Sequence, residues 1–180
     1  MAVVGTLAVT LAVISAVWPA AQPTPSDNRQ PGTEQVRHLS DLPFISISNG
    51  LGPVAIDQAN GDSEVDDGGP ITIGDQVFAR GLGVHAPSQI RFYPAAACTR
   101  FVAQVGVDSE AGDGGSVAFQ VLADGRSVYN SDVLTGQDGP RAIDIDLDNV
   151  EVLDLIVTDG HDGAAGDGAA WAGAFLTCQD

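Results

Sequence analysis

One histidine in this sequence lies in a glycine-framed stretch that suits contact with a ligand. Residues 81–88 read Gly-Leu-Gly-Val-His-Ala-Pro-Ser, which places His85 directly after a short strand-forming run. Glycine permits close backbone approach or positive φ, and proline ends regular strand pairing. The stretch therefore predicts a strand that turns into a loop at His85. Such a histidine either contacts a ligand or bonds a neighbouring loop, and the residues alone leave both interpretations open.

Two acidic, glycine-rich loops are candidates for calcium. Residues 107–113 contribute Asp108 and Asp113, and residues 159–167 contribute Asp159 and Asp162. Calcium takes about six to eight oxygen ligands from carboxylates and backbone carbonyls. Neither loop has the spacing of an EF-hand, and aspartate also caps turns. A structural calcium and plain acidic turns are therefore both open interpretations of these loops.

Catalytic signatures are missing from the chain. The nucleophile-elbow pattern, the P-loop and the dinucleotide-binding fingerprint do not occur. The chain is therefore not expected to be an enzyme. It carries 24 acidic and 7 basic residues, for a net charge of −17, and every basic residue is arginine. Nucleic-acid binding requires a basic patch, so nucleic acid is not an expected partner.

The elements that would hold these loops read as short strands. Apolar residues alternate with others at residues 101–107, 117–121 and 143–147, which buries one face of each segment. Asp124-Gly125 between two such runs predicts a tight hairpin. Helical periodicity is not sustained anywhere after the N-terminal segment. Many short strands without intervening helices predict an all-β, antiparallel β-sandwich.

The N-terminal part differs from the rest in composition. Residues 1–21 are apolar and uncharged, which is typical of a signal peptide or of a transmembrane anchor. Residues 22–38 are rich in proline and polar residues and predict a linker, which leaves residues 39–180 for the folded domain. In an exported chain, Cys98 and Cys178 predict one disulfide bond, and two buried thiols are the alternative.

Taken together, the motifs resemble the NPCBM family, also classed as carbohydrate-binding module family 51. The resemblance covers residues 39–178, about three quarters of the chain. It rests on these motifs: Leu39-Ser40-Asp41-Leu42, Gly52-Pro53-Val54 with Asp57, Gly81-Leu82-Gly83-Val84-His85-Ala86, Val105-Gly106-Val107-Asp108, Gly115-Ser116-Val117, Ala123-Asp124-Gly125, and Asp167 leading to Trp171. The chain differs from its relatives at Leu51, where they usually have Trp, and at residues 167–171, where they tend to read Asp-His-Ala-Asp-Trp.

The resemblance implies a jelly-roll β-sandwich of the galactose-binding type, often with a structural calcium. Sugar recognition needs planar hydrogen-bonding groups and a stacking surface. The candidate sugar-binding residues are His85, Asp57, Arg80, Asp167 and Trp171. Two of them have alternatives: Arg80 could instead pair with a carboxylate, and Trp171 could be a core aromatic.

The expected function is therefore a non-catalytic carbohydrate-binding module for galactose-type glycans, secreted or displayed at the cell surface. Relatives usually accompany glycoside hydrolases or belong to surface proteins, so a catalytic or signalling domain of a longer protein is an expected partner. The alternative is a membrane-anchored sensory or adhesive ectodomain that binds a protein or a cell-wall polymer.

Overall fold

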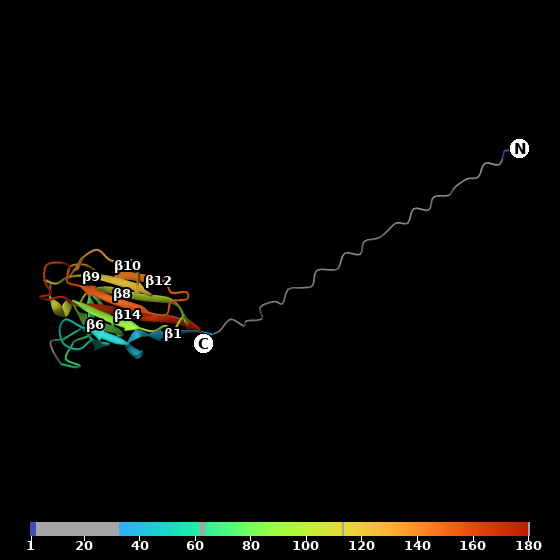
Figure 1. Cartoon of the computed structure of the whole chain (residues 1–180). Coiled ribbons are helices and arrows are strands. Elements are labelled where there is room, and N and C mark those ends of the chain that lie inside the picture. The colour runs from blue at the N-terminus through green and yellow to red at the C-terminus, as the bar shows by residue number, and fades with distance from the viewer. Residues whose placement is uncertain (3–32, 62–63, 113, 180) are drawn as a thin grey trace. The chain divides into compact units, whose positions relative to one another are not determined.

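The computed structural model describes residues 1–2, 33–61, 64–112 and 114–179 (Figure 1). Apart from residues 1–2, the predicted signal or anchor segment, residues 1–21, lies outside these ranges, as does most of the predicted linker. Within the described residues, no helix has the length and apolar character needed to cross a membrane.

The folded unit is an antiparallel β-sandwich, as predicted. The first sheet has the order β12 (Arg141–Asp146), β8 (Cys98–Val107), β14 (Gly168–Gln179), β6 (Gly81–His85) and β3 (Ala55–Ile56), and β1 (Glu34–His38) also pairs with β14. The second has the order β10 (Arg126–Asn130), β9 (Ser116–Ala123), β13 (Leu153–Thr158), β7 (Ser88–Phe92) and β2 (Ser46–Ser48), and β11 (Leu134–Thr135) pairs with β9. Short 3₁₀ turns form η1 (Leu39–Asp41) and η2 (Ser109–Ala111).

The core fills the space between the sheets with the alternating residues that the sequence identifies. Phe101 on β8 and Phe119 on β9 are buried on either side of Trp171 from β14, which is fully buried. The Trp171 and Phe119 rings meet edge to face with their centroids 5.0 Å apart. Edge-to-face aromatic pairs add stabilisation beyond the area that they bury. The side chain of Trp171 therefore anchors the two sheets to each other.

The hairpin formed by β4 (Ile71–Ile73) and β5 (Gln76–Phe78) covers part of the first sheet's other face. Ile71 and Ile73 pack there against Ala170 and Ala172, so this part of β14 is buried on both faces. Gly106 on β8 has no room for a side chain, because a Cβ atom would lie 2.3 Å from Ile73. The β4–β5 hairpin therefore packs tightly against the end of β8. The segment that leads into the hairpin is held beside this end of the strand as well.

The predicted hairpin turn and the predicted disulfide are both confirmed. Asp124 and Gly125 have positive φ values of 49° and 76°, as a tight two-residue turn between β9 and β10 requires. Cys98 and Cys178 form a disulfide bond between the paired strands β8 and β14. Their sequence separation is 80, and closing so long a loop contributes about 4 kcal/mol in the chain-entropy model.

The strand β1 lies inside the segment predicted as linker. It pairs with β14 from Glu34, opposite Gln179, to His38, opposite Phe175. Most of its side chains are exposed, so it shows none of the apolar alternation by which a strand is predicted. The folded unit therefore begins before residue 39, and main-chain hydrogen bonds hold its first strand.

Candidate functional site

His85 lies at the end of β6, where a loop from earlier in the chain wraps around it. The backbone N–H of His85 donates to Asn49 Oδ1 at 2.8 Å, and the N–H of Gly50 donates to the His85 carbonyl at 3.0 Å. A Cβ atom on Gly50 would lie 2.3 Å from the Ala86 carbonyl oxygen, so only glycine fits there. These contacts hold the following residue, Leu51, at the same loop end as His85.

The imidazole of His85 has one nitrogen fixed and one available. Its Nδ1 lies 2.9 Å from the Ala86 carbonyl oxygen. A carbonyl oxygen only accepts hydrogen bonds, so Nδ1 must donate its proton, and in the neutral ring Nε2 is an acceptor. The ring therefore bonds its own loop through one edge and presents a hydrogen-bond acceptor at the other. The bond within the loop is therefore observed, and contact with a ligand stays a prediction for this residue.

A pocket of about 500 Å³ opens beside this histidine. It combines carboxylates, an amide, an imidazole, one apolar side chain and several small residues that leave space. The lining residues are Leu51, Asn60, Gly61, Asp67, His85, Glu110, Ala111, Gly166 and Gly168. Pockets of this size with a few convergent polar groups are the usual form of a small-ligand site.

Three polar residues of the pocket were not among the sequence candidates: Asn60, Asp67 and Glu110. Glu110 comes from η2, and its Oε2 accepts the backbone N–H of Gly69 at 2.7 Å. This bond ties η2 to the segment that leads into the β4–β5 hairpin. The signal that could have found Glu110 is its place inside the acidic loop at residues 107–113.

Asp108, predicted as a calcium ligand, is a buried cap of η2. Its Oδ1 accepts the N–H of Glu110 and its Oδ2 accepts the N–H of Thr72, each at 2.9 Å. Burial raises the pKa of Asp108, and the neighbouring charge of Glu110 adds to the increase. Both carboxylate oxygens thus fix the position of Glu110 and of the hairpin, and calcium binding by Asp108 stays a prediction.

Asp167 lies beside His85 but behind the wall of the pocket. The residue after it, Gly168, pairs with His85 across β14 and β6, and Asp167 itself is almost completely buried. Its Oδ1 accepts the N–H of Ser116 at 2.9 Å, whereas its Oδ2 is buried without a hydrogen-bond partner in the described protein. Burial raises the pKa of Asp167, and the charges of Asp162 and Asp159 act in the same direction.

Two aspartates of the second acidic loop, residues 159–167, lie near the carboxylate of Asp167. Asp162 Oδ1 accepts the Ser116 hydroxyl at 2.8 Å, and Asp159 Oδ1 accepts the N–H of His161 at 3.2 Å. No three acidic, histidine or cysteine side chains in the described ranges are placed to hold a metal ion together. Asp113 lies outside the described residues. Because Asp167 Oδ2 has no hydrogen-bond partner in the described residues, calcium binding stays a prediction for this loop.

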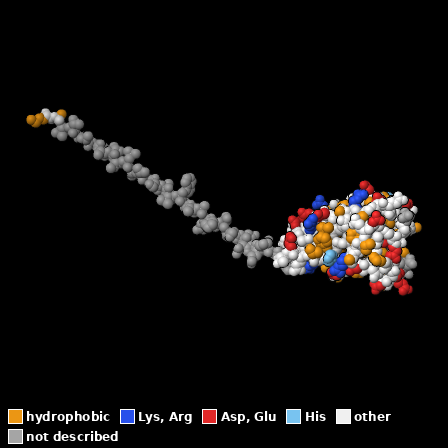
Figure 2. Space-filling model, turned by 180° about the vertical axis from the view of Figure 1, so that it is seen from behind, with side chains coloured by type: hydrophobic (Ala, Val, Ile, Leu, Met, Phe, Trp, Pro, Cys, Tyr) orange, Lys and Arg blue, Asp and Glu red, His pale blue; other side chains and the backbone are white. Residues whose placement is uncertain are grey.

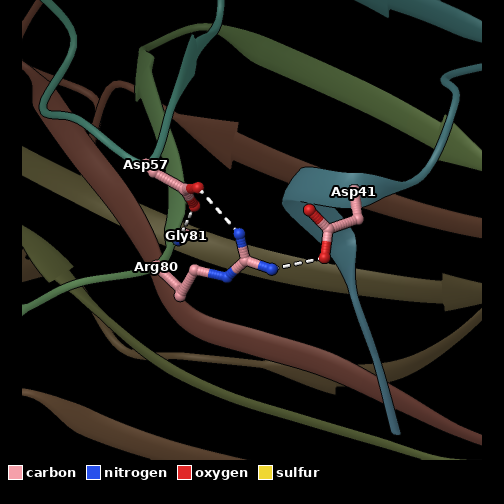
Figure 3. A network of polar contacts seen from close by, with 4 residues as sticks. All are labelled: Asp41, Asp57, Arg80 and Gly81. Carbon is pink, nitrogen blue, oxygen red and sulfur yellow. Dashed lines mark hydrogen bonds and ion pairs between the residues drawn. The ribbon is translucent and has the colours of Figure 1, made fainter.

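Asp57 and Arg80, predicted to act with His85, lie at the other end of β6 (Figure 3). Arg80 Nη1 lies 3.1 Å from Asp57 Oδ2, and its Nη2 pairs with Asp41. Asp57 Oδ1 accepts the N–H of Gly81 at 3.0 Å. Because β6 has 5 residues, this network is about 13 Å from His85 along the strand. The predicted grouping is therefore wrong, and for Arg80 the alternative of pairing with carboxylates applies.

Trp171 is also not available to a sugar. Its side chain has no exposed surface and lies between Phe101 and Phe119. Stacking on a sugar ring requires an exposed aromatic face. The core alternative therefore describes Trp171, and the apolar surface in the pocket comes from Leu51, which is 39% exposed.

The outer surface shows no large basic patch on the face drawn in Figure 2. Acidic and arginine side chains are scattered there among apolar and neutral ones. Three arginines of the described chain are occupied by carboxylates: Arg80 with Asp41 and Asp57, Arg91 with Asp154, and Arg100 with Asp144. The site at His85 is thus a polar, acidic pocket in the loops at one end of a β-sandwich.

This fold and pocket define the class of β-sandwich ligand-binding modules. The model of the NPCBM/NEW2 domain matches residues 35–177, so the chain belongs to the NPCBM family. A Renibacterium salmoninarum protein, whose name is that of an endo-alpha-N-acetylgalactosaminidase, is 37% identical over 143 residues; the match covers 79% of this chain and 10% of that protein. The chain thus spans about a tenth of the length of this relative.

Two solved structures from Clostridium perfringens share the fold. The CBM51 of a GH95 protein, in complex with methyl-galactose, is 29% identical, with a TM-score of 0.72 over 79% of this chain and 100% of that one. The CBM51-2 and INT domains of ZmpB, in complex with GlcNAc, are 28% identical, with a TM-score of 0.73 over 81% of this chain and 32% of that one. The likeness places this chain among the CBM51 domains.

Proposed function

We propose that this chain is a non-catalytic module that binds one terminal galactose-type sugar in the pocket at His85. The observation that carries the proposal is the arrangement of the pocket: an imidazole acceptor at Nε2 lies in the same pocket as the Asn60 amide and two carboxylates. These groups match the hydroxyls of a sugar, which both donate and accept hydrogen bonds. The methyl-galactose complex of a related CBM51 domain supports the choice of sugar.

The affinity is expected to be low. Leu51 offers only a small apolar surface, and no phenylalanine, tyrosine or tryptophan is among the lining residues of the pocket. A site with a few polar contacts and little stacking suggests a dissociation constant between about 1 μM and 1 mM, or about −8 to −4 kcal/mol. Such weak binding suits a module that keeps an attached domain near its glycan.

The proposal extends to the setting of the module. The disulfide between Cys98 and Cys178 supports an exported protein, because disulfides persist in oxidising compartments. The short coverage of the Renibacterium relative supports a place beside a catalytic domain in a longer protein. A membrane anchor at residues 1–21 stays a prediction, because residues 3–21 lie outside the described ranges.

Titration of the full chain with methyl galactoside and with GlcNAc, followed by amide chemical shifts, tests the function. Replacing His85 with alanine should weaken binding by about 1–3 kcal/mol, because one hydrogen-bonding group is lost while the fold is retained. Tyr93→Ala is the matched control: Tyr93 is an exposed aromatic 58% accessible to solvent, and it follows β7 at the end remote from the pocket.

The outcome is decisive in either direction. Unchanged binding in the Tyr93 variant and weakened binding in the His85 variant support the pocket. No shift with either sugar at high millimolar concentration would refute sugar binding, and an ectodomain with a protein or polymer ligand would then replace it.

A further inference from the structure

A hollow of about 300 Å³ lies over β2 and β7 of the second sheet, apart from the pocket at His85. The two cavities share no lining residue. The hollow is formed by two paired strands, and its lining residues are Ser46, Ile47, Ser48, Gln89 and Arg91. Because the proposed function does not use these residues, the hollow can be assessed by its own chemistry.

The hollow results from the lengths of the side chains that face each other across the two strands. Ile90 of β7 is fully buried, so its neighbours Gln89 and Arg91 project from the outer face of the sheet. Ser46 lies opposite Arg91 and Ser48 lies opposite Gln89, so both serines project from that face as well. Short serine side chains beside long ones leave a depression, and Gln89 and Arg91 form one of its walls.

A buried carboxylate fixes the position of this wall. Asp154 of β13 lies opposite Arg91 on the outer face, yet it is only 1% exposed. Its Oδ1 accepts Arg91 Nε at 2.7 Å and Gln89 Nε2 at 3.0 Å, and its Oδ2 accepts Arg91 Nη2 at 3.0 Å. Burial raises the pKa of Asp154, but these bonds outweigh it and the net pKa is lowered. The carboxylate is therefore ionised and balances the charge of Arg91.

The bonds to Asp154 leave hydrogen-bonding groups of both side chains for a ligand. A carboxylate only accepts hydrogen bonds, so Gln89 turns its amide nitrogen toward Asp154 and keeps a second N–H and its carbonyl oxygen. Asp154 engages the edge of Arg91 formed by Nε and Nη2, and the N–H groups of Nη1 lie on the other side of the planar guanidinium. The side chain of Arg91 is 42% exposed. A buried ion pair contributes little stability by itself, so what this one provides is two planar groups held in one orientation.

The rest of the outer face continues this neutral, polar surface. A row of side chains crosses five strands from the hollow to β10, and by the strand register it consists of Ser48, Gln89, Ile156, Gln120 and Asn130. At the far end of the row, Gln120 Nε2 donates to Asn130 Oδ1 at 2.7 Å. The row has no charged residue, whereas the whole chain has a net charge of −17. Four spacings between strands make the row about 19 Å long.

Such a surface suits a neutral ligand that is rich in hydroxyl groups. Sugar hydroxyls both donate and accept hydrogen bonds, which matches the amides and the guanidinium, and the C–H face of a sugar ring can contact the partly exposed Ile156. An anionic chain would instead approach a strongly acidic protein, and the arginine of the hollow is already paired with a carboxylate.

We propose that the outer face of the second sheet, from Ser48 and Gln89 to Asn130, is a second binding site that takes interior residues of a neutral glycan chain. The row is longer than one sugar ring, so it suits a chain better than a single sugar. This inference goes beyond the proposed function, because the pocket at His85 takes a terminal sugar and shares no residue with this face. A polymer that reaches both sites would be held by two weak contacts at once, which raises its avidity.

The test is a titration of the full chain with β-1,4-galactotetraose and with cellotetraose, two neutral chains, followed by backbone and side-chain amide chemical shifts. At least one of them should shift Ser46, Ser48 and the side-chain amide of Gln89, and these shifts should persist in the His85→Ala variant. The tetramer of galacturonic acid, which carries a carboxylate on every ring, should bind this face more weakly.

Two variants of the face and one control separate this site from general effects. Gln89→Leu removes the amide at similar size and should weaken binding to the face about fivefold, the size of one net hydrogen bond. Ser48→Leu fills the hollow at an exposed position of β2, away from the core, and should weaken binding at least as much. The matched control is Gln104→Leu, the same replacement on the outer face of the first sheet, since Ala103 and Val105 on either side of it belong to the core.

The outcomes distinguish the two proposed sites. Shifts confined to the residues around His85 would overturn the second site and leave the proposed function intact, whereas shifts confined to the sheet face would support the second site and count against the pocket. Equal weakening in the Gln89 and Gln104 variants would overturn the inference, and so would equal affinity for the acidic and the neutral chains. If no sugar causes shifts in either place, both proposals fail.

Discussion

Replacing Arg80 with alanine separates a structural role for its ion-pair network from a role in sugar binding. Arg80 bridges Asp57 and Asp41, and the three side chains are 37%, 28% and 57% exposed (Figure 3). If the network is structural, the variant should lose stability and keep the affinity for methyl galactoside. If Arg80 contacts sugar, the reverse should be found.

The expected loss of stability follows from the exposure of each pair. The pair with Asp41 is largely exposed and contributes about 0.5 kcal/mol. The pair with Asp57 contributes more, about 1 kcal/mol, because this carboxylate is less exposed and loses a charged hydrogen-bond partner. Asp57 keeps its bond from the N–H of Gly81, so the strand end remains held. The free energy of unfolding should therefore fall by about 1.5 kcal/mol in total.

Urea unfolding, followed by the near-ultraviolet circular dichroism of the buried Trp171, measures this change. The matched control is Asp41→Asn, which removes only the more exposed pair and should cost about a third as much. Acid adds a second readout. Burial raises the pKa of Asp57, but the N–H of Gly81 and Arg80 outweigh it, and the net pKa is lowered. The stability from this lowered pKa is present above the unfolded pKa and is lost as pH falls through the folded value.

The Arg80 variant should therefore show a smaller loss of stability in acid than the wild type. Retained stability together with lost galactoside binding would refute the structural interpretation. It would also mean that the sugar site extends along β6 from His85 to the other end of the strand.

Two further predictions concern the second acidic loop. Millimolar calcium should raise the melting temperature by mass action if this loop binds it, and the Asp162→Asn variant should lose that increase; identical melts in calcium and in chelator would exclude binding. Asp167→Asn tests the raised pKa of the buried carboxylate, since asparagine can still accept the N–H of Ser116. Wild-type stability should decline as pH rises from the unfolded pKa, about 3.9, to the higher folded value, because the carboxyl group ionises in the unfolded chain while the buried one stays protonated. The variant should not show this decline, and parallel pH profiles for the two proteins would contradict the assignment.

Much of the fold could be predicted because local patterns carry it. Alternating apolar residues identify β8, β9 and β12, and their inward side chains are buried as expected. The Asp124-Gly125 turn is specified by the backbone preferences of two residues. By contrast, β1 has no local pattern, because its position depends on pairing with β14, far along the chain.

The site was predicted less well, because its residues meet only through the order of strands in the sheets. His85 has a local signature, but Asn60, Asp67 and Glu110 reach it from separate loops. Asp57 and Arg80 carry suitable chemistry, yet they lie one strand length away from His85. Trp171 has the side chain of a sugar platform, and only the packing of the two sheets decides that it faces inward.

The pairing of β1 with β14 has a consequence for how the module can be combined with other proteins. Glu34 lies opposite Gln179, so the folded unit is entered and left at neighbouring points. β14 has 12 residues and runs from Gly168, beside His85, to Gln179, so these points are about 36 Å from the pocket along the strand. A unit of this kind can be inserted into a surface loop of a host protein without stretching that loop. For the same reason, a short peptide could join residues 34 and 179, and new termini could be opened at Asp124-Gly125. Such a circular permutant should keep its pocket, which lies at the end of the domain opposite the new peptide link.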